Sequence, residues 1–541
     1  MNTNIKILLS ILFLFISYSK SFSQPQTEWV QRFNSSGNYN DYVTDMAIDK
    51  SGNVYLTGFI QVNDTDQNFV TIKYNTQGVE QWVRYYDGPD HREDKPVAIA
   101  VDDSGNVFVS GTSSLNFLTI KYNSLGDTIW SRRNLNGYGL NAMILDNYGN
   151  VYVTGIAFGV SSEDILTIKY NNYGDLIWIR YFNGVGNGYD IPLNVSHDKE
   201  NNIIISAQIT GLFLIPMGVV IKYNSLGDLT WISDNPDSFV FFSSYSDSFY
   251  NLYSVGHSEI YNNTDINLSK FNLSGNLEWS RNYNRSDTVP DQDDFYKGFT
   301  LDRQFNPIFT CVNSDNVLRY DIATVKYDSA GNFLWERIFG ESNSNDESNS
   351  ITTDQYGNIY VCGFVDNGLF AKYIIIKYDT FGLLKWFISY NNNNSFTSHS
   401  ARKVLADTLG NIYVTGISQG SGTGYDIATI KYSQLTNLNQ TNDYKINDYL
   451  LFQNYPNPFN PVTHLEFGIP DLGFVSLKVY DMLGKEVKTL VNEIKPAGIY
   501  SIDLDGSDLP SRIYYYKLVV SLSNPIESGN FTQVRKMILV K

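Results

Sequence analysis

The chain has 541 residues, a formal net charge of −17 at pH 7 and only 18% charged residues. This length exceeds that of one ordinary core and favours several domains or a repeat architecture. The acidic balance argues against unaided binding to a nucleic-acid backbone, which needs clustered Lys and Arg. Cys311 and Cys362 are the only cysteines, so a disulfide framework is excluded and a Cys-based zinc site is not expected. Both lie in apolar runs and are predicted to be buried.

The N-terminus has the features of a cleaved signal peptide. Lys6 provides a positive flank, and an apolar run from Ile7 to Ile16 is interrupted only by Ser10. A run of this length is too short to span a bilayer but suits a signal peptide. No later stretch could span a membrane as a helix. We therefore predict a signal peptide over residues 1–23 and an exported mature protein without a transmembrane segment.

One sequence block recurs eight times over residues 25–433. The full pattern is Asp, two residues and Gly-Asn, then an alternating apolar strand, and later a strand ending in Ile-Lys-Tyr or a variant of it. Five copies of the Gly-Asn strand are clear: Gly52–Gly58, Gly105–Gly111, Gly149–Gly155, Gly357–Gly363 and Gly410–Gly416. Three are degenerate: Asn201–Ala207, Tyr250–Gly256 and Phe305–Cys311. The lysines are Lys73, Lys121, Lys169, Lys222, Lys270, Lys326, Lys377 and Lys431.

A tryptophan stands nine residues after each of the first seven lysines. These tryptophans are Trp82, Trp130, Trp178, Trp231, Trp279, Trp335 and Trp386. The eighth copy has Gln440 at that position. The remaining tryptophan, Trp29, directly follows the signal peptide in a similar context, WVQRF. The strand missing from the last copy therefore lies at the beginning of the chain.

Each repeat supplies four short strands. Four-stranded antiparallel sheets arranged radially form the blades of a β-propeller. An N-terminal strand that completes the last blade ties such a ring shut, whereas an open solenoid needs caps at its ends. We predict an all-β fold with a closed eight-bladed β-propeller. Seven blades is the alternative if the degenerate unit near residues 232–260 is not a full blade.

We expect structural roles for the repeated residues. Gly permits a positive φ in the Asp-x-x-Gly-Asn turn, whose Asp and Asn bond local backbone groups. The Trp is expected to be buried, and the Lys stem to pack between blades with its ammonium on an acid or a carbonyl. The repeat, with Ile-Lys-Tyr and Trp, resembles the bacterial β-propeller repeat family SBBP over about residues 25–433. This resemblance implies a fold rather than an activity, because propellers host unrelated functions.

A polar stretch at residues 434–448 suits a linker between the propeller and a C-terminal domain at residues 449–541. The domain opens on the proline-rich run LLFQNYPNPFNP. Alternating apolar patterns then predict strands that form a small β-sandwich. The predicted strands are His464–Ile469, Val475–Tyr480, Glu486–Leu490, Ile499–Leu504, Ile513–Val520 and Thr532–Val540.

The C-terminal domain resembles the type A sorting domain of the type IX secretion system of Bacteroidetes. Two departures are Leu504, where the family usually has Trp, and Ser511-Arg512, where Gly is common. The resemblance implies recognition by the outer-membrane translocon and later removal; the residues alone equally suit a binding module. The motif residues are Pro456, Asn457, Pro458, Phe459, Gly484, Gly498 and Lys541.

Two faces of the propeller follow from its strand order. The Asp-x-x-Gly-Asn and Tyr-Asn-x-x-Gly turns share one side, here called the regular-turn face. The connections of variable length gather on the other side, the variable-loop face, where function usually resides. One loop there holds a potential acid/base pair with a histidine, and another an acidic cluster that could bind calcium; a solvated charged loop is the plain alternative for each. The candidate residues are Asp90, His91 and Asp94, and Asp291, Asp293 and Asp294.

No catalytic motif is apparent, and the five histidines show no metal-ligand spacing. We therefore predict a non-catalytic binding module for a glycan or a protein, secreted or attached to the cell surface, without a cofactor or catalytic residue. The alternative is an extracellular glycan hydrolase or lyase with carboxylates at the channel mouth. A structural coat protein without a ligand is a third possibility.

Overall fold

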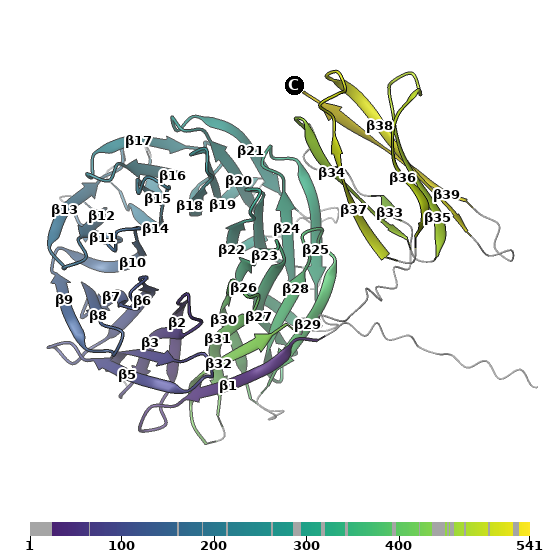
Figure 1. The fold of residues 1–541 in the computed structure, drawn as a ribbon. Helices are drawn as coiled ribbons and strands as arrows, with labels where there is room; N and C mark the ends of the chain where they lie inside the picture. Colours follow the sequence, from purple (N-terminus) through teal and green to yellow (C-terminus); the bar gives the residue numbers. More distant parts are fainter. Residues whose placement is uncertain are drawn as a thin grey trace, which may run out of the picture. The chain divides into compact units, whose positions relative to one another are not determined.

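The chain divides into two compact units, Met1–Leu435 and Thr436–Lys541. The predicted signal peptide and the predicted linker beyond Gln434 lie outside the described residues. Figure 1 shows the computed structural model, which describes residues 24–541 apart from 64, 160–161, 187, 212–214, 261–262, 285–293, 315–319, 341–343, 392–396, 421, 435–449, 452–453, 455–458, 470–471, 496–497 and 523–529.

The first unit consists of eight four-stranded antiparallel sheets that follow one another around a common centre, as the blades of a β-propeller do (Figure 1). The described residues contain strands and no helix, so the all-β class is confirmed. The innermost strand of each sheet contacts that of the next, and the first sheet contacts the eighth. The degenerate unit near residues 232–260 lies in a full four-stranded sheet, so the count is eight and the seven-bladed alternative is wrong.

The strands of the first four sheets are β2 (Asp41–Ile48), β3 (Val54–Gln61), β4 (Gln67–Tyr74), β5 (Glu80–Tyr86), β6 (Asp94–Val101), β7 (Val107–Ser113), β8 (Asn116–Tyr122), β9 (Thr128–Asn134), β10 (Gly137–Leu145), β11 (Val151–Phe158), β12 (Glu163–Tyr170), β13 (Leu176–Phe182), β14 (Ile191–His197), β15 (Ile203–Thr210), β16 (Pro216–Tyr223) and β17 (Leu229–Asp234).

Those of the last four sheets are β18 (Val240–Ser246), β19 (Leu252–Ile260), β20 (Asn263–Phe271), β21 (Leu277–Tyr283), β22 (Asp294–Leu301), β23 (Pro307–Ser314), β24 (Tyr320–Tyr327), β25 (Phe333–Phe339), β26 (Asn345–Thr353), β27 (Ile359–Asp366), β28 (Ala371–Tyr378), β29 (Leu384–Tyr390), β30 (His399–Ala406), β31 (Ile412–Gln419), β32 (Tyr425–Ser433) and β1 (Gln26–Phe33). Cys311 and Cys362, in β23 and β27, are fully buried as predicted.

The N-terminal strand completes the last sheet. β1 pairs antiparallel with β32, and the strand order of this sheet is β1-β32-β31-β30. Trp29 Nε1 donates to Thr76 O of the first sheet at 3.1 Å. One sheet further along, Trp82 Nε1 donates to Ser124 O at 3.2 Å in the same way. The prediction that Trp29 replaces the missing tryptophan of the last repeat is confirmed.

The aspartate of each Asp-x-x-Gly-Asn turn organises its own hairpin. Asp354 Oδ1 accepts the N–H groups of Tyr356 and Asn358 at 2.8 and 2.9 Å. Asp354 Oδ2 accepts Asn358 Nδ2 and the Tyr360 hydroxyl at 2.7 and 2.9 Å. Gly357 has a φ of +80°, which glycine adopts without steric cost. In the degenerate copies the same position has a φ of 61°, 65° or 58°, at Asn201, Tyr250 and Phe305 respectively.

The repeat lysines link neighbouring sheets, as the sequence predicts. Lys169 lies over the Tyr152 ring, 4.9 Å from its centroid, and donates to Ser225 O of the next sheet at 2.9 Å. In the fourth sheet Ile204 stands where the third has Tyr152, so no tyrosine hydroxyl reaches the turn aspartate. There the repeat lysine binds the aspartate directly. Lys222 and Asp198 form such an ion pair at 2.9 Å.

The second unit contains a three-stranded sheet, β33-β34-β37, and a four-stranded sheet, β36-β35-β38-β39. One hydrophobic cluster takes residues from both sheets, including Leu465, Leu477 and Leu504. The strands are β33 (Leu450–Leu451), β34 (Val462–Ile469), β35 (Gly473–Tyr480), β36 (Glu486–Lys495), β37 (Gly498–Asp505), β38 (Arg512–Leu522) and β39 (Asn530–Leu539).

Candidate functional site

Asp90 and His91 lie in the connection between β5 and β6, on the variable-loop face, and both are exposed. Asp90 forms an ion pair with Arg133 at 3.3 Å. His91 Nδ1 lies 2.7 Å from Asp87 Oδ2, and this hydrogen bond raises the pKa of His91. Each side chain therefore has a local partner of opposite charge, which suits a solvated charged loop.

Asp94 lies apart from these two residues because it is buried at the start of β6. Its Oδ2 accepts the Gly88 N–H at 2.5 Å. Burial raises the pKa of Asp94, and the negative charges of Asp87 and Asp66 raise it further. The structure thus separates the predicted acid/base group into two exposed residues and one buried carboxyl.

The predicted acidic cluster of the sixth repeat is described only in part. Asp291 and Asp293 lie outside the described residues. Asp294 is buried at the start of β22 in the sixth sheet, four sheets along the ring from Asp94. The two predicted groups therefore occupy different parts of the ring.

A series of buried aspartates escaped the sequence analysis, although a spacing signal was present. In five repeats an aspartate stands eight residues before the aspartate of the Asp-x-x-Gly-Asn turn. The remaining repeats have Tyr138, Phe239 and His399 at this position. All five aspartates are buried where the innermost strand of the sheet begins: Asp41, Asp94, Asp190, Asp294 and Asp346.

A second series faces the first across the junctions between sheets. It stands five residues before each repeat lysine and comprises Asn68, Asn116, Asp164, Met217, Asp265, Asp321, Lys372 and Asp426. The negative charge of Asp164 raises the pKa of Asp190, after the larger effect of burial. Between the fourth and fifth sheets the two positions hold Met217 and Phe239, so both are apolar at this junction.

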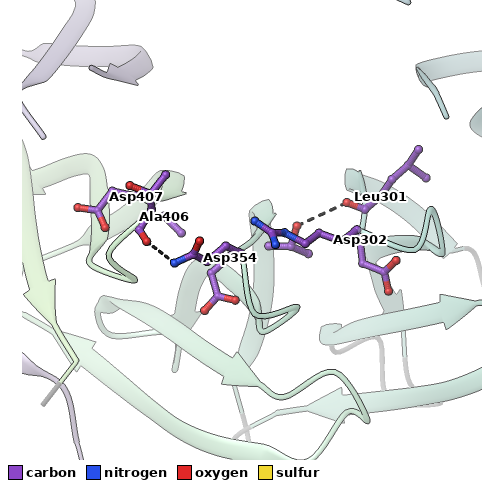
Figure 2. Close-up of a pocket in the computed structure, with 9 residues that line it drawn as sticks. Leu301, Asp302, Asp354, Ala406 and Asp407 are labelled. Atoms are coloured by element: carbon purple, nitrogen blue, oxygen red, sulfur yellow. Dashed lines mark hydrogen bonds between the residues drawn. The ribbon is translucent and has the colours of Figure 1, made fainter. Parts of the chain in front are cut away.

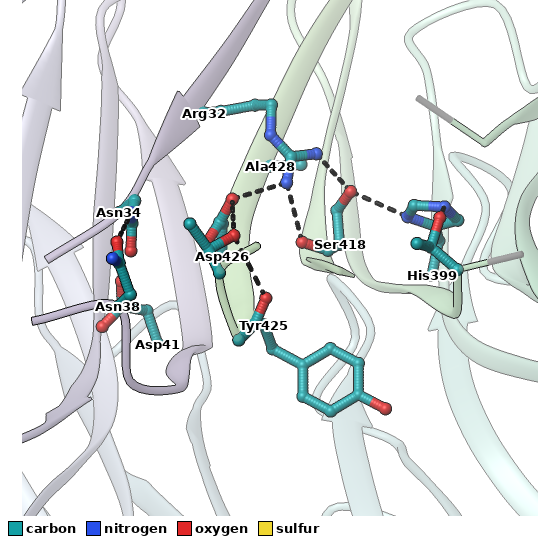
Figure 3. Close-up of polar contacts among 12 residues, drawn as sticks. Arg32, Asn34, Asn38, Asp41, His399, Ser418, Tyr425, Asp426 and Ala428 are labelled. Carbon is teal, nitrogen blue, oxygen red and sulfur yellow. Dashed lines mark hydrogen bonds and ion pairs between the residues drawn. The ribbon is translucent and has the colours of Figure 1, made fainter. Parts of the chain in front are cut away.

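The junction between the eighth and first sheets is drawn in Figure 3. Arg32 of β1 donates to Asp426 Oδ2 at 2.6 Å and to Ser418 O at 2.9 Å. Burial raises the pKa of Asp41 to about 6, with a contribution from the Asp426 charge. His399 Nδ1 lies 2.8 Å from Ser418 Oγ, and burial lowers the pKa of this imidazole to about 4. β1, which completes the eighth sheet and is here called the latch strand, thus supplies the cation that pairs with the buried Asp426.

Two cavities lie on the opposite, regular-turn face. One, of about 290 Å³, is lined by three consecutive turns that contain Asp302, Asp354 and Asp407 (Figure 2). The other, of about 470 Å³, lies between the turns of the first two sheets. Asp407, like Asp354, already accepts four hydrogen bonds from its own hairpin. These carboxylates are therefore engaged in holding the turns.

Among the described residues, no three His, Cys, Asp or Glu side chains lie together in a metal-binding arrangement. In the same part of the chain, no helix has the length and apolar character needed to cross a membrane.

The described residues of the predicted sorting motif hold the C-terminal unit together. Phe459 is buried in the shared core, and its N–H donates to Ile538 O at 2.9 Å. Gly484 has a φ of +77° in the turn of Asp481, and Gly498 begins β37. Lys541 Nζ donates to Ser507 O at 2.6 Å. Pro456, Asn457 and Pro458 lie outside the described residues.

Two protein families match the chain. Residues 28–64 and 334–363 match the family described as Beta-propeller repeat, SBBP. Residues 453–539 match the family described as Secretion system C-terminal sorting domain. The chain carries SBBP β-propeller repeats and ends in a secretion-system sorting domain. Both predicted resemblances are thereby confirmed. The sorting domain belongs to type IX secretion and marks this SBBP-repeat protein for export to the cell surface or beyond.

No curated protein sequence matches the SBBP-repeat protein. Solved structures that resemble it are distant. The WD40 domain of SCAP from fission yeast has 11% identity and a TM-score of 0.42, with 75% of this chain and 95% of that chain covered. The β-propeller domain of the Trilobed protease from Pyrococcus furiosus has 8% identity and a TM-score of 0.38, with 62% and 93% covered. A protein of unknown function from Dyadobacter fermentans has 9% identity and a TM-score of 0.39, with 75% and 98% covered.

Proposed function

We propose that this secreted propeller protein is a non-catalytic binding module whose variable-loop face holds an extracellular protein. We further propose that its eight sheets form a closed propeller and that the two C-terminal sheets form a β-sandwich. The bond between Trp29 of the eighth sheet and Thr76 of the first supports closure. The core that both C-terminal sheets share supports the sandwich.

The observation that carries the binding proposal is a set of exposed apolar side chains on the variable loops of three consecutive sheets. Phe158 is 74% exposed at the end of β11, and its ring stacks on Tyr138 with centroids 4.2 Å apart. A contiguous exposed apolar surface marks an interaction site, and we propose that these neighbouring loops form one for a protein. We call the set the apolar loop set; its members are Leu115, Leu135, Phe158, Val185, Tyr189 and Ile215, all on connections of sheets two to four.

The regular-turn face also exposes apolar residues, but there they occupy the tips of separate tight hairpins. Tyr148 and Tyr173 are examples, one in each hairpin turn of the third sheet. Single exposed apolar residues are normal on a protein surface. These two tyrosines therefore provide matched controls for Phe158 and Tyr189 of the apolar loop set.

The test uses the purified chain, immobilised and offered outer-surface proteins and polysaccharides, with retained and released material measured together. We expect retention of a protein without any product. The double variant Phe158→Ala/Tyr189→Ala should weaken retention at least about tenfold, because each exposed aromatic anchor contributes more than about 1 kcal/mol. Tyr148→Ala/Tyr173→Ala should retain the ligand normally.

Three results would contradict the proposal. Equal loss in both double variants would place binding elsewhere. Retention of a polysaccharide alone would replace the protein ligand with a glycan. Release of cleaved polysaccharide would establish the enzyme alternative and direct substitutions to carboxylates of the variable-loop face.

Export through the sorting domain has its own test. A chain without residues 449–541 should fold its propeller but accumulate in the periplasm of a host with type IX secretion. Cell fractionation with an antibody against the propeller measures this distribution. Truncated protein found outside the cell would contradict the assignment of the C-terminal unit as the export signal.

A further inference from the structure

The junction between the first and second sheets brings several side-chain oxygens together on the variable-loop face. Gln67, at the start of β4, forms an isolated parallel bridge with Glu93, next to Asp94. Asp66 directly precedes β4 and Asn68 is the second residue of that strand, so the two flank Gln67. Asn68 occupies the position that faces Asp94 across the junction, as Asp164 faces Asp190 two junctions further on.

Two of these oxygens are buried and accept no hydrogen bond: Asp66 Oδ1 and Asn68 Oδ1. Asp94 Oδ1 is also buried, and the Ser113 hydroxyl is the one side-chain donor that acts on this carboxylate. Asp66 is only 8% exposed and Asp94 is fully buried. A buried carboxylate oxygen without a donor costs free energy unless a cation or a proton compensates it. The arrangement therefore indicates a missing positive charge.

Three basic side chains nearby have other partners. Lys95 pairs with Glu93 at 3.2 Å, Arg133 with Asp90 at 3.3 Å, and His91 with Asp87 at 2.7 Å. In the described part of the chain, no ion pair involves Asp66 or Asp94. The junction of the eighth and first sheets differs, because Arg32 compensates Asp426 there.

We propose that Asp66, Asn68 and Asp94 form a binding site for a calcium ion at the junction of the first two sheets. Calcium takes six to eight oxygen ligands from carboxylates, amide and backbone carbonyls and water, in flexible geometry. Two carboxylates and one amide oxygen supply a suitable partial set, and water completes it. Magnesium demands a near-ideal octahedron and dehydrates reluctantly, so the loose set favours calcium.

The wall of the site is close-fitting at Gly88. A Cβ atom at this position would lie 2.6 Å from Ser113 Oγ and 2.8 Å from Asp94 Oδ1. The main chain thus approaches the carboxylate closely, and the Gly88 N–H fixes Asp94 Oδ2 at 2.5 Å. This bond orients Asp94 so that its Oδ1, which lies beside the Ser113 hydroxyl, is turned away from the Gly88 N–H.

The test compares calcium binding by the chelator-treated full chain and its variants, using isothermal titration calorimetry and the midpoint of thermal unfolding at pH 7.5. We expect calcium, but not the same concentration of magnesium, to raise the wild-type midpoint. Loss of a group that only orients a ligand costs about 10- to 100-fold in metal affinity. Asp94→Asn and Asp66→Asn should therefore weaken the strongest site at least about 100-fold.

Asp90→Asn is the matched control, because Asp90 is an exposed carboxylate of the same loop that already has a partner. It should bind calcium within about twofold of the wild type. Asn68→Leu removes a neutral ligand without adding or removing charge. It supplies the decisive variant if circular dichroism shows that the aspartate variants do not fold.

Two results would overturn the proposal. The first is a wild-type chain whose unfolding midpoint and heat of titration do not respond to calcium. The second is an unchanged affinity in Asp94→Asn, Asp66→Asn or Asn68→Leu, whichever of them folds. Stabilisation by low pH alone, with no response to calcium, would assign the site to a shared proton instead.

Discussion

The two faces of the propeller are built on different principles. On the regular-turn face, each aspartate accepts bonds from its own hairpin. Five tryptophans also donate to a turn of the next sheet: Trp29, Trp82, Trp130, Trp178 and Trp231. On the variable-loop face, the charge of Asp426 contributes to the raised pKa of the buried Asp41 across a sheet junction. Local bonds repeat with the sequence, whereas junction contacts differ from blade to blade. We therefore expect the free energy of unfolding to depend mainly on the regular contacts, and ligand binding and pH dependence to depend on the variable ones.

The largest effect is expected from removal of the latch strand. Deletion of residues 26–34 removes β1 with Trp29, Phe33 and the Arg32 bond to Asp426. It should cost more than about 5 kcal/mol, since burial of one Trp alone contributes about 3–5 kcal/mol. Calorimetric unfolding of the purified chain measures the loss. An unchanged melting temperature would refute ring closure through β1.

Removal of a single repeat tryptophan should have the next largest effect. Trp130 Nε1 donates to Asn172 O at 3.1 Å, and Gly174, with a φ of +82°, lies against its ring. Trp130→Ala should cost about 3–5 kcal/mol in denaturant unfolding. Phe158→Ala, an exposed aromatic of the other face, should cost less than about 1 kcal/mol. Equal costs would erase the distinction between the faces.

Loss of a turn aspartate should lower the free energy of unfolding more than loss of a loop aspartate. Asp354→Ala removes the acceptor of four hydrogen bonds in its hairpin, and we expect a loss of about 2–3 kcal/mol. Asp90→Ala, which removes one exposed ion pair, should stay within about 0.5 kcal/mol of the wild type. Urea unfolding of both variants measures the difference. A larger cost for Asp90→Ala would reverse the assignment of roles to the faces.

The smallest effect is a pH dependence at the latch junction. Burial raises the pKa of Asp41 from 3.8 to about 6, so the folded state holds this proton more tightly than the unfolded state. The resulting stability is fully present below pH 4 and is lost as the pH rises through about 6. Between pH 4.5 and 7.5 it should decline by about 2 kcal/mol.

Asp41→Asn removes the titrating group and should reduce the pH dependence by this amount. Urea unfolding of both proteins at the two pH values measures it. An identical pH dependence in the variant would show that Asp41 does not titrate in this range.

Much of the architecture was available in the sequence. The five Gly-Asn strands with their three degenerate copies, the repeat lysines and the displaced Trp29 predict the sheets, their order and the role of β1, because these residues recur at nearly constant spacing. The candidate site was less accessible. Asp90, His91 and Asp94 were grouped from their adjacency in the chain, but the first two are exposed and the third is buried. Burial depends on the neighbouring sheet, which adjacency does not describe.

The sequence by itself determined the repeat architecture, the N-terminal strand that completes the last sheet, and the C-terminal sorting domain. Each follows from a local, repeated or motif-like pattern with a direct physical counterpart in turns and alternating strands. Only the tertiary structure decided which acids meet across a junction, and that Asp66 and Asn68 hold buried oxygens without a donor near the buried Asp94. Asp66 and Asn68 belong to the first sheet and Asp94 to the second, so their proximity depends on how these two sheets pack at residues that the repeat does not conserve in type.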